Sequence, residues 1–146
     1  EVFSFGFNNH GELGLGDLTG REEPTLIEGI PKMKFISCGM FQTRCIDEED
    51  FLWQCGNNQN GELGLGNTTN YRSMVKYQNF RVRNVSSGGC HVLLLDIENK
   101  LWVAGANAKG QLGLGDNSRR ISHTSLLVEN DFQIKDPDST GKRVKS

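Results

Sequence analysis

Three glycine-rich blocks are the residues most suggestive of chemistry, because closely spaced glycines can form loops whose backbone amides cradle a phosphate. The blocks read G-F-N-N-H-G-E-L-G-L-G at 6–16, G-N-N-Q-N-G-E-L-G-L-G at 56–66 and G-A-N-A-K-G-Q-L-G-L-G at 105–115. None contains the G-x-x-x-x-G-K-[ST] pattern of a phosphate-binding loop, and no strand–helix unit follows any of them. Three equivalent nucleotide sites in so short a chain would also be unusual. We therefore interpret the blocks as structural turns.

The other reactive side chains do not form a catalytic pattern. His10 and His123 lie at variable positions of the chain, and no Ser/His/Asp set is evident. The four cysteines contain no C-x-x-C pair; they are Cys38, Cys45, Cys55 and Cys90. We expect small, buried thiols in a reducing compartment, with a metal site or a disulfide as the alternative. The sequence thus predicts a protein that is not an enzyme, with no catalytic residue, metal or cofactor.

Charged side chains are the candidates for contacting a partner. We expect the acidic run Asp47, Glu48, Glu49 and Asp50 to be a solvated hairpin tip, with a contact for a basic partner as the alternative. Arg81 and Arg83 alternate, so both would lie on one face of a strand and could bind an acidic partner. Arg119 and Arg120 are expected in a loop after the third glycine block.

All these residues are positioned by an internal repeat. The glycine blocks begin 50 and 49 residues apart, and each has asparagine at its third position: Asn8, Asn58 and Asn107. We expect these asparagines to hydrogen-bond backbone within their turns. An apolar–aromatic pair precedes each block, at 2–3, 52–53 and 101–102. A second block also recurs, Ile36-Ser37-Cys38-Gly39 matching Val85-Ser86-Ser87-Gly88. One fixed period indicates a repeat architecture.

The pattern of apolar residues predicts about four short strands in each unit. We expect outer strands at 25–27, 74–77 and 125–128, and inner strands at 33–38 and 80–86. The strands between them are expected at 2–5, 43–46, 52–55, 91–95 and 101–104, and no amphipathic helix is evident. The predicted fold class is therefore all-β, with β-propeller blades of four antiparallel strands forming an incomplete propeller. Trp53 and Trp102 are expected to pack between blades.

The repeats define the predicted domain organisation. Residues 1–130 hold about two and a half to three units, and 131–146 is expected to be a disordered polar tail or a broken blade. Residues 132–134 weakly match the start of another inner strand. So few blades would leave apolar faces uncovered, because each blade buries its faces against its neighbours. We therefore expect further blades from a longer parent chain, or self-association that completes the propeller.

Composition narrows the function classes. Hydrophobic residues make up 36% of the chain, and no apolar run is long enough to span a bilayer, so no membrane insertion is predicted. The net charge of −2 does not favour direct contact with a nucleic acid. No secretory leader is visible, so we expect a cytoplasmic or nuclear protein.

The full pattern resembles the repeat of the regulator of chromosome condensation family. It reads [LV]-[WF]-x-x-G-x-N-x-x-G-[EQ]-L-G-L-G, preceded by [IV]-S-[CS]-G. The resemblance implies a seven-bladed propeller that serves as a binding platform. The founding member of the family is the nucleotide exchange factor for the small GTPase Ran and docks on chromatin. The family's histidine after the second block is His91 in one unit but Gln42 in the other, which indicates a turn-holding role.

We predict a protein–protein interaction module, a scaffold that presents loops to a protein partner. The candidate surface is formed by the variable connectors 17–34, 67–79 and 116–124. Two alternatives follow from the resemblance. One is a guanine-nucleotide exchange factor, a regulator of a Ran-like small GTPase, with chromatin as a further partner. The other is a substrate-recognition domain of a ubiquitin ligase.

Overall fold

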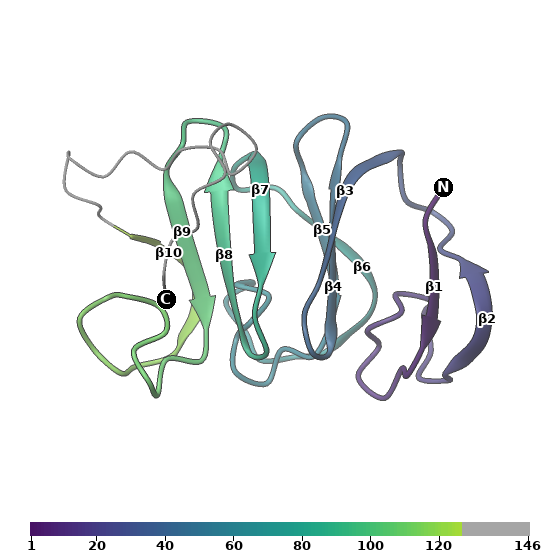
Figure 1. Cartoon of the computed structure of the whole chain (residues 1–146), viewed down its shortest axis with the longest axis horizontal. Helices are drawn as coiled ribbons and strands as arrows, with labels where there is room; N and C mark the ends of the chain where they lie inside the picture. Colours follow the sequence, from purple (N-terminus) through teal and green to yellow (C-terminus); the bar gives the residue numbers. More distant parts are fainter. Residues whose placement is uncertain (127–146) are drawn as a thin grey trace, which may run out of the picture.

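The computed structural model describes residues 1–126, which form three antiparallel sheets and no helix (Figure 1). β1 (Phe3–Gly6) and β2 (Arg21–Leu26) form a two-stranded sheet. The second sheet has the order β3 (Met33–Cys38), β4 (Gln42–Asp47), β5 (Leu52–Gly56) and β6 (Tyr71–Tyr77). The third has the order β7 (Val82–Ser87), β8 (His91–Asp96), β9 (Leu101–Gly105) and β10 (Arg120–Leu126).

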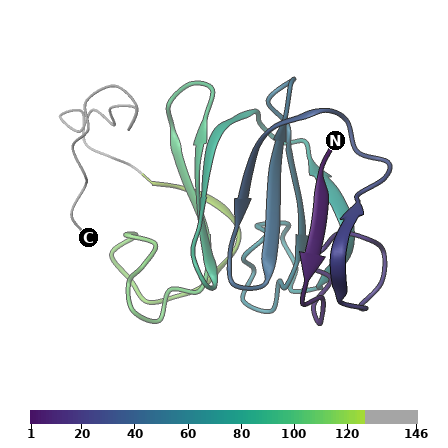
Figure 2. The same ribbon diagram turned by 45° about the vertical axis from the view of Figure 1, so that its right-hand side comes forward.

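Figure 2 shows the sheets standing side by side, as blades do. The all-β fold, the four antiparallel strands per blade and the incompleteness of the propeller are thus confirmed. The predicted inner strand at 132–134 and the tail 131–146 lie outside the described residues.

The outer strands begin earlier than the sequence pattern indicated. They start at Arg21, Tyr71 and Arg120, each of which pairs with the glycine that ends the neighbouring strand. The register shifts just beyond these pairs, so the apolar pattern is interrupted there. The inner strand β7 begins at Val82 instead of residue 80.

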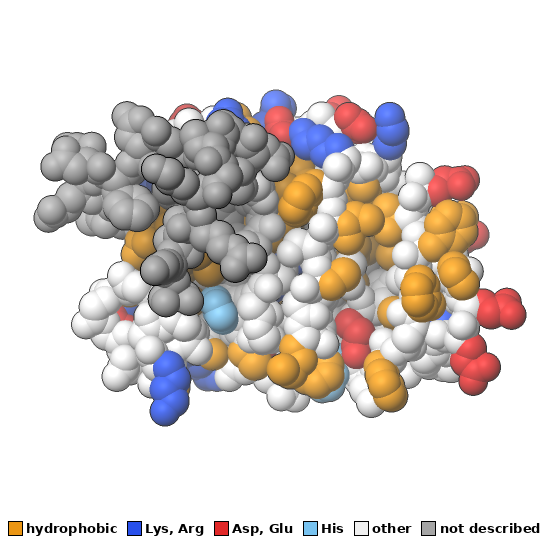
Figure 3. Space-filling view, viewed as in Figure 1, with side chains coloured by type: hydrophobic (Ala, Val, Ile, Leu, Met, Phe, Trp, Pro, Cys, Tyr) orange, Lys and Arg blue, Asp and Glu red, His pale blue; other side chains and the backbone are white. Residues whose placement is uncertain are grey.

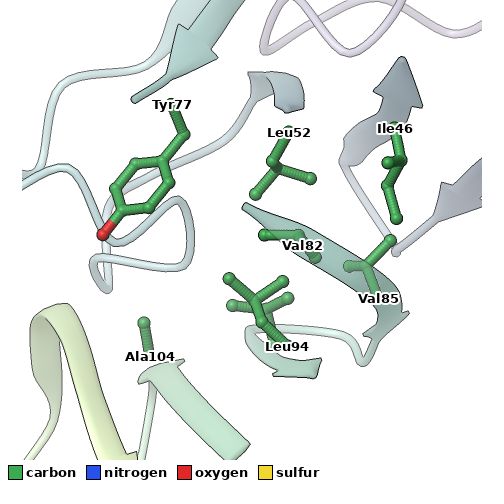
Figure 4. Close-up of a cluster of buried hydrophobic side chains, with 8 residues drawn as sticks. Ile46, Leu52, Tyr77, Val82, Val85, Leu94 and Ala104 are labelled. Carbon is green, nitrogen blue, oxygen red and sulfur yellow. The ribbon is translucent and has the colours of Figure 1, made fainter. Parts of the chain in front are cut away.

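The largest hydrophobic cluster lies where the second and third sheets meet (Figure 4). The second sheet contributes Ile46, Leu52 and Tyr77 to it. The third sheet contributes the remaining members, which are Val82, Val85, Val92, Leu94 and Ala104. Trp102 is half-buried, packs against the cluster and stacks on Phe80 with ring centroids 4.5 Å apart, so the expected packing between blades is confirmed for this residue. Trp53 is half-buried and lies outside the cluster.

The first sheet and β3 of the second sheet expose apolar side chains whose repeat equivalents are buried. Phe5 is 63% exposed, whereas Cys55 and Ala104 at the same repeat position are fully buried. Ile36 is 48% exposed and its equivalent Val85 only 3%. Within residues 1–126, β1 pairs with β2 alone, whereas β5 and β9 each have a strand on both sides. The described part of the chain therefore presents an open apolar sheet face, and orange side chains gather over β1 and β2 in Figure 3.

His123 on β10 is a buried titratable group in the interface between the second and third sheets. Its ring lies edge-to-face on Tyr77, with ring centroids 4.7 Å apart, and fills the space beside Gly64. Neither ring nitrogen has a hydrogen-bond partner within the described structure. Burial, with a smaller effect of the nearby Arg44 charge, lowers the pKa of His123 to about 3. The folded protein therefore holds this imidazole neutral.

Because His123 is buried as a neutral group, the free energy of unfolding should fall as the pH is lowered. The substitution His123→Met should remove this pH dependence. An unfolded histidine titrates near pH 6.5, so between about pH 6.5 and 3 the unfolded state binds more protons and stability falls as the pH drops. The expected slope is about 1.4 kcal/mol per pH unit. Methionine is a matched replacement because Met74 occupies the equivalent position of the second sheet.

The measurement is urea unfolding of both proteins at pH 7 and 4.5. The free energy of unfolding of the wild type should fall relative to the variant by about 2–3 kcal/mol between these pH values. Parallel pH dependence of the two proteins would show that His123 is protonated in the folded state.

Candidate partner-binding surfaces

Each glycine block is closed by one buried asparagine. The Asn58 side-chain oxygen accepts from the Leu63 amide (2.9 Å), and its nitrogen donates to the Asn67 carbonyl (3.0 Å). Asn8 and Asn107 make the equivalent bonds, and none of the three is more than 1% exposed. The predicted turn hydrogen bonds are confirmed. Loop amides such as Gly61 and Gly64 donate to carbonyls inside the loop, so they are not available to a phosphate.

The first two glycine blocks also dock on the outer strand of the following sheet. The Gly16 amide donates to the Arg72 carbonyl (2.9 Å), and the Gly66 amide donates to the Ile121 carbonyl (2.8 Å). Backbones approach so closely here that a Cβ on Gly61 would lie 2.4 Å from the Ile121 Cα. Its φ of +80° also favours glycine. The glycines therefore join neighbouring blades.

A comparison of Gly61→Ala with Gly110→Ala tests this docking. Both glycines have positive φ, but a Cβ on Gly110 would meet nothing closer than 3.8 Å. Each variant should lose about 1–2 kcal/mol through the left-handed backbone. Only Gly61→Ala should lose a further ~2 kcal/mol or more, because its methyl group would displace the neighbouring strand. Chemical denaturation gives both values, and equal losses would mean that the block does not hold the next blade.

The tip end is the edge of the molecule formed by the hairpin turns 47–51 and 96–100 and the connectors 27–32 and 78–81, at the top of Figure 1. The prediction of a solvated tip is wrong for Asp47, which is 3% exposed. Its carboxylate accepts from the Glu49 and Phe51 amides (both 2.9 Å) and from the Trp53 indole nitrogen (2.9 Å). The Asp47 carboxylate therefore stabilises the turn and fixes the position of the Trp53 ring.

The rest of the acidic run lies on the surface beside lysines. Glu48 pairs with Lys32 at 3.3 Å, and Asp50 pairs with Lys34. Glu49 is exposed, and no ion pair to it is formed within residues 1–126. Figure 3 shows these acidic and basic side chains interleaved along the upper edge. The run is thus part of a mixed charged surface, and its contact with a partner stays a prediction.

Arg81 and Arg83 also lie at the tip end, and both are exposed on either side of the buried Val82. Arg81 precedes β7, and its guanidinium carbon lies 5.3 Å from the Phe51 ring centroid. The Arg83 guanidinium donates to the Asn99 side-chain oxygen at 2.7 Å. The expected alternation is thus present, but only Arg83 lies within the strand, which begins at Val82. Binding of an acidic partner by these arginines stays a prediction.

The glycine end, formed by the three glycine blocks and the turns 39–41 and 88–90, contains the other two arginines. Arg120 is the first residue of β10 rather than a loop residue, and it pairs with Asp116 at 2.6 Å. The hydrogen bond from Arg120 lowers the pKa of Asp116. Arg119 donates to the Gln59 carbonyl (3.2 Å) and so links two neighbouring blocks. The structure therefore does not bring the predicted contact residues into one site.

The variable connectors do not form one loop surface either. The connectors 17–34, 67–79 and 116–124 contain most of β2, β6 and β10, so each runs along an outer strand. All three connectors begin at the glycine end, and the first two run on to the tip end. Their exposed residues are therefore spread along the outer strands, from one edge of the molecule to the opposite edge (Figure 1).

The turn position occupied by Gln42 and His91 has a structural role, as predicted. The Gln42 side chain donates to the Gly89 carbonyl of the next blade (3.3 Å). A Cβ on Gly88 would lie 2.2 Å from the His91 ring, so glycine makes room for that ring. These side chains brace the turns beside the inner strands.

The cysteines are four free thiols with different surroundings. Cys45 and Cys55 are fully buried, and burial raises the pKa of each to about 12. The expectation of burial is wrong for Cys38, which is exposed on β3. No group of three potential metal ligands is found among residues 1–126, and no helix in that range is long and apolar enough to cross a membrane.

Sequence reasoning missed the aspartate–tryptophan pair that organises each hairpin tip. Asp96 accepts from the Trp102 indole nitrogen at 2.8 Å, as Asp47 does from Trp53. The sequence contains a pattern that could have predicted this pair, because an aspartate precedes the tryptophan by six positions in both units.

Comparison with known proteins adds family information to this geometry. The profile of the Regulator of chromosome condensation (RCC1) repeat matches residues 1–46 and 49–95. The X-linked retinitis pigmentosa GTPase regulator of Mus musculus is 39% identical over 101 residues, covering 64% of this chain and 10% of that protein. The ultraviolet-B receptor UVR8 of Arabidopsis thaliana is 33% identical over 96 residues, covering 62% of this chain and 22% of the receptor.

Solved structures confirm the fold. Human WBSCR16 superposes with a TM-score of 0.74 at 18% identity, covering 87% of this chain and 35% of that protein. Prp20p of Saccharomyces cerevisiae, whose structure was described with its binding to Gsp1p and histones, gives a TM-score of 0.74 at 16% identity. That match covers 87% of this chain and 34% of Prp20p.

Proposed function

This chain belongs to the regulator of chromosome condensation (RCC1) repeat family, and from that premise we propose that it is a protein–protein interaction scaffold within a larger regulatory protein. It acts by binding, without covalent chemistry. The proposal is carried by one observation. Within each glycine block the residues that close the loop are the same and buried, while exposed positions beside them differ.

The contrast is clear at the glycine end. The buried asparagine and the leucine that binds it recur in all three blocks. The exposed position after each of these asparagines is instead asparagine, glutamine or alanine: Asn9, Gln59 and Ala108. The second residue of the outer strand is equally variable: Glu22, Arg72 and Ile121. A fixed scaffold with variable edge residues is the arrangement that carries recognition in repeat proteins.

The larger protein is proposed from the open sheet face and from the coverage of the relatives. The chain spans about a tenth of the length of the GTPase regulators that it matches. We propose that further blades cover the exposed Phe5 and Ile36, because isolated blades cannot bury their apolar faces. Free, buried thiols such as Cys45 and Cys55 suit a reducing compartment, so we place the protein in the cytoplasm or nucleus.

A second candidate function is regulation of a Ran-like small GTPase. It is favoured by two similar proteins, one a GTPase regulator and the other described with its binding to Gsp1p and histones. In this case the propeller would accelerate nucleotide release by distorting the nucleotide site of the GTPase. The ubiquitin-ligase alternative has no observation of its own and stays a prediction.

Affinity capture with edge variants tests the scaffold proposal. The immobilised chain should retain a protein partner in stoichiometric amounts from cytoplasmic or nuclear extract. One variant neutralises the tip end (Glu48→Gln with Arg81→Gln), and its matched control neutralises the glycine end (Lys109→Gln with Arg119→Gln). We expect one pair of substitutions to weaken capture by about tenfold, with unchanged thermal stability, since a charged hydrogen bond contributes about 1.5–3 kcal/mol. No retained protein, or equal retention by both variants, would contradict the proposal.

A nucleotide-release assay separates the two functions. Release of fluorescent GDP from a Ran-type GTPase should keep its intrinsic rate when the chain is added in excess. Acceleration that depends on chain concentration would instead replace the scaffold proposal with the exchange regulator.

A further inference from the structure

The glycine end contains a groove between the first and second glycine blocks. The loops that carry these blocks lie at the lower edge of the ribbon in Figure 1. Its volume is about 390 Å³. One wall is formed by residues of the first block and its continuation, His10 and Leu18 among them. The other wall is formed by Gln59, the 68–70 segment and Arg72. The groove therefore spans two blades that are held together by the Gly16–Arg72 backbone bond.

The repeat explains why this groove is open. In the next pair of blocks, Arg119 reaches across and donates to the Gln59 carbonyl (3.2 Å). The equivalent residue here is Asn70, which is shorter and turns inward, where its side-chain oxygen accepts from the Asn58 amide (2.8 Å). The space that an arginine crosses in one pair of blades is thus left free in the other.

The lining of the groove suits a negatively charged group. It contains the guanidinium of Arg72 and the imidazole of His10 and no aspartate or glutamate. The Arg72 side chain makes no ion pair or hydrogen bond within residues 1–126, and the buried Nδ1 atom of His10 has no partner there. By contrast, Arg21 at the start of β2 is already paired with Asp17 at 2.7 Å.

The remaining lining groups suit a peptide backbone. The amide side chains of Asn9 and Gln59 and the hydroxyls of Thr68 and Thr69 supply both donors and acceptors. Leu18, which is 42% exposed on the rim, offers contact to an aliphatic side chain. A single guanidinium among neutral groups does not form the extended basic track that a nucleic-acid backbone requires.

We propose that this groove binds an acidic peptide segment, with a carboxylate on Arg72 and an aliphatic neighbour on Leu18. This inference rests on the proposed scaffold function and names the partner chemistry at one of its edges. The carboxylate forms a charge-assisted hydrogen bond with the guanidinium, and the amide side chains bind the peptide backbone.

The test uses the full chain, ¹⁵N-labelled, with the acetylated and amidated peptide Glu-Leu-Glu-Leu-Glu as the probe. The neutral peptide Gln-Leu-Gln-Leu-Gln is the matched control. We expect saturable chemical-shift changes at the amides of residues 9–10, 59 and 68–72 with the acidic peptide only. Arg72→Gln should weaken binding about tenfold, the loss of one charge-assisted hydrogen bond. Arg83→Gln at the tip end should leave the affinity unchanged.

Asn70→Arg separates a shaped site from simple charge attraction. The new arginine would cross the groove as Arg119 does between the next two blocks, so peptide binding should be lost although positive charge is added. Stronger binding by Asn70→Arg would overturn the proposal in favour of unspecific attraction. Absence of saturable shifts, or stronger binding of a single-stranded DNA oligonucleotide, would also overturn it. If the acidic peptide shifts only tip-end amides, the groove is excluded while the scaffold function stands.

Discussion

Backbone contact between neighbouring blades is the constraint on which the rest of this structure depends. A four-stranded sheet with two apolar faces is not stable alone, so each sheet must lie against the next. Here the approach is closest at the glycine blocks, where Gly11 and Gly61 face the backbone of the following outer strand. Any side chain at these positions would displace that strand. The repeated glycines therefore follow from how blades are joined and not from a ligand.

The contact between blades is polar as well as apolar. Arg44 is fully buried between the second and third sheets and donates to the Ser87 hydroxyl (2.9 Å) and the Glu62 carbonyl (2.7 Å). Burial lowers the pKa of Arg44 to about 10, so the side chain is still charged at neutral pH. The third sheet has Leu93 at the equivalent position. Because a buried charge tolerates few alternative partners, Arg44 favours one relative placement of these two sheets.

The fold could be predicted from the sequence because the repeat period and the glycine pattern report the same strand order. Strand ends were less predictable, since the bulges beside Gly56 and Gly105 interrupt the apolar alternation from which strands are recognised. The charge of a side chain was also a poor guide to whether it is exposed. Asp47 resembles a solvent-exposed residue by its charge, but it accepts a hydrogen bond from the Trp53 indole within the same hairpin, a pairing indicated by the repeated spacing of six residues and not by the charge. The groove at Arg72 depends on how Asn70 is oriented, and a sequence pattern does not contain that information.

The central claim is that the glycine blocks join blades through backbone hydrogen bonds. Amide hydrogen exchange of the intact chain tests it most directly. The Gly66 amide donates to the Ile121 carbonyl, whereas the equivalent Gly115 amide has no hydrogen-bond partner within residues 1–126. The account predicts that Gly16 and Gly66 exchange as slowly as amides inside the strands, while Gly115 exchanges rapidly. Rapid exchange of all three glycines would contradict it, because the blocks would then be loops that merely lie beside the next blade.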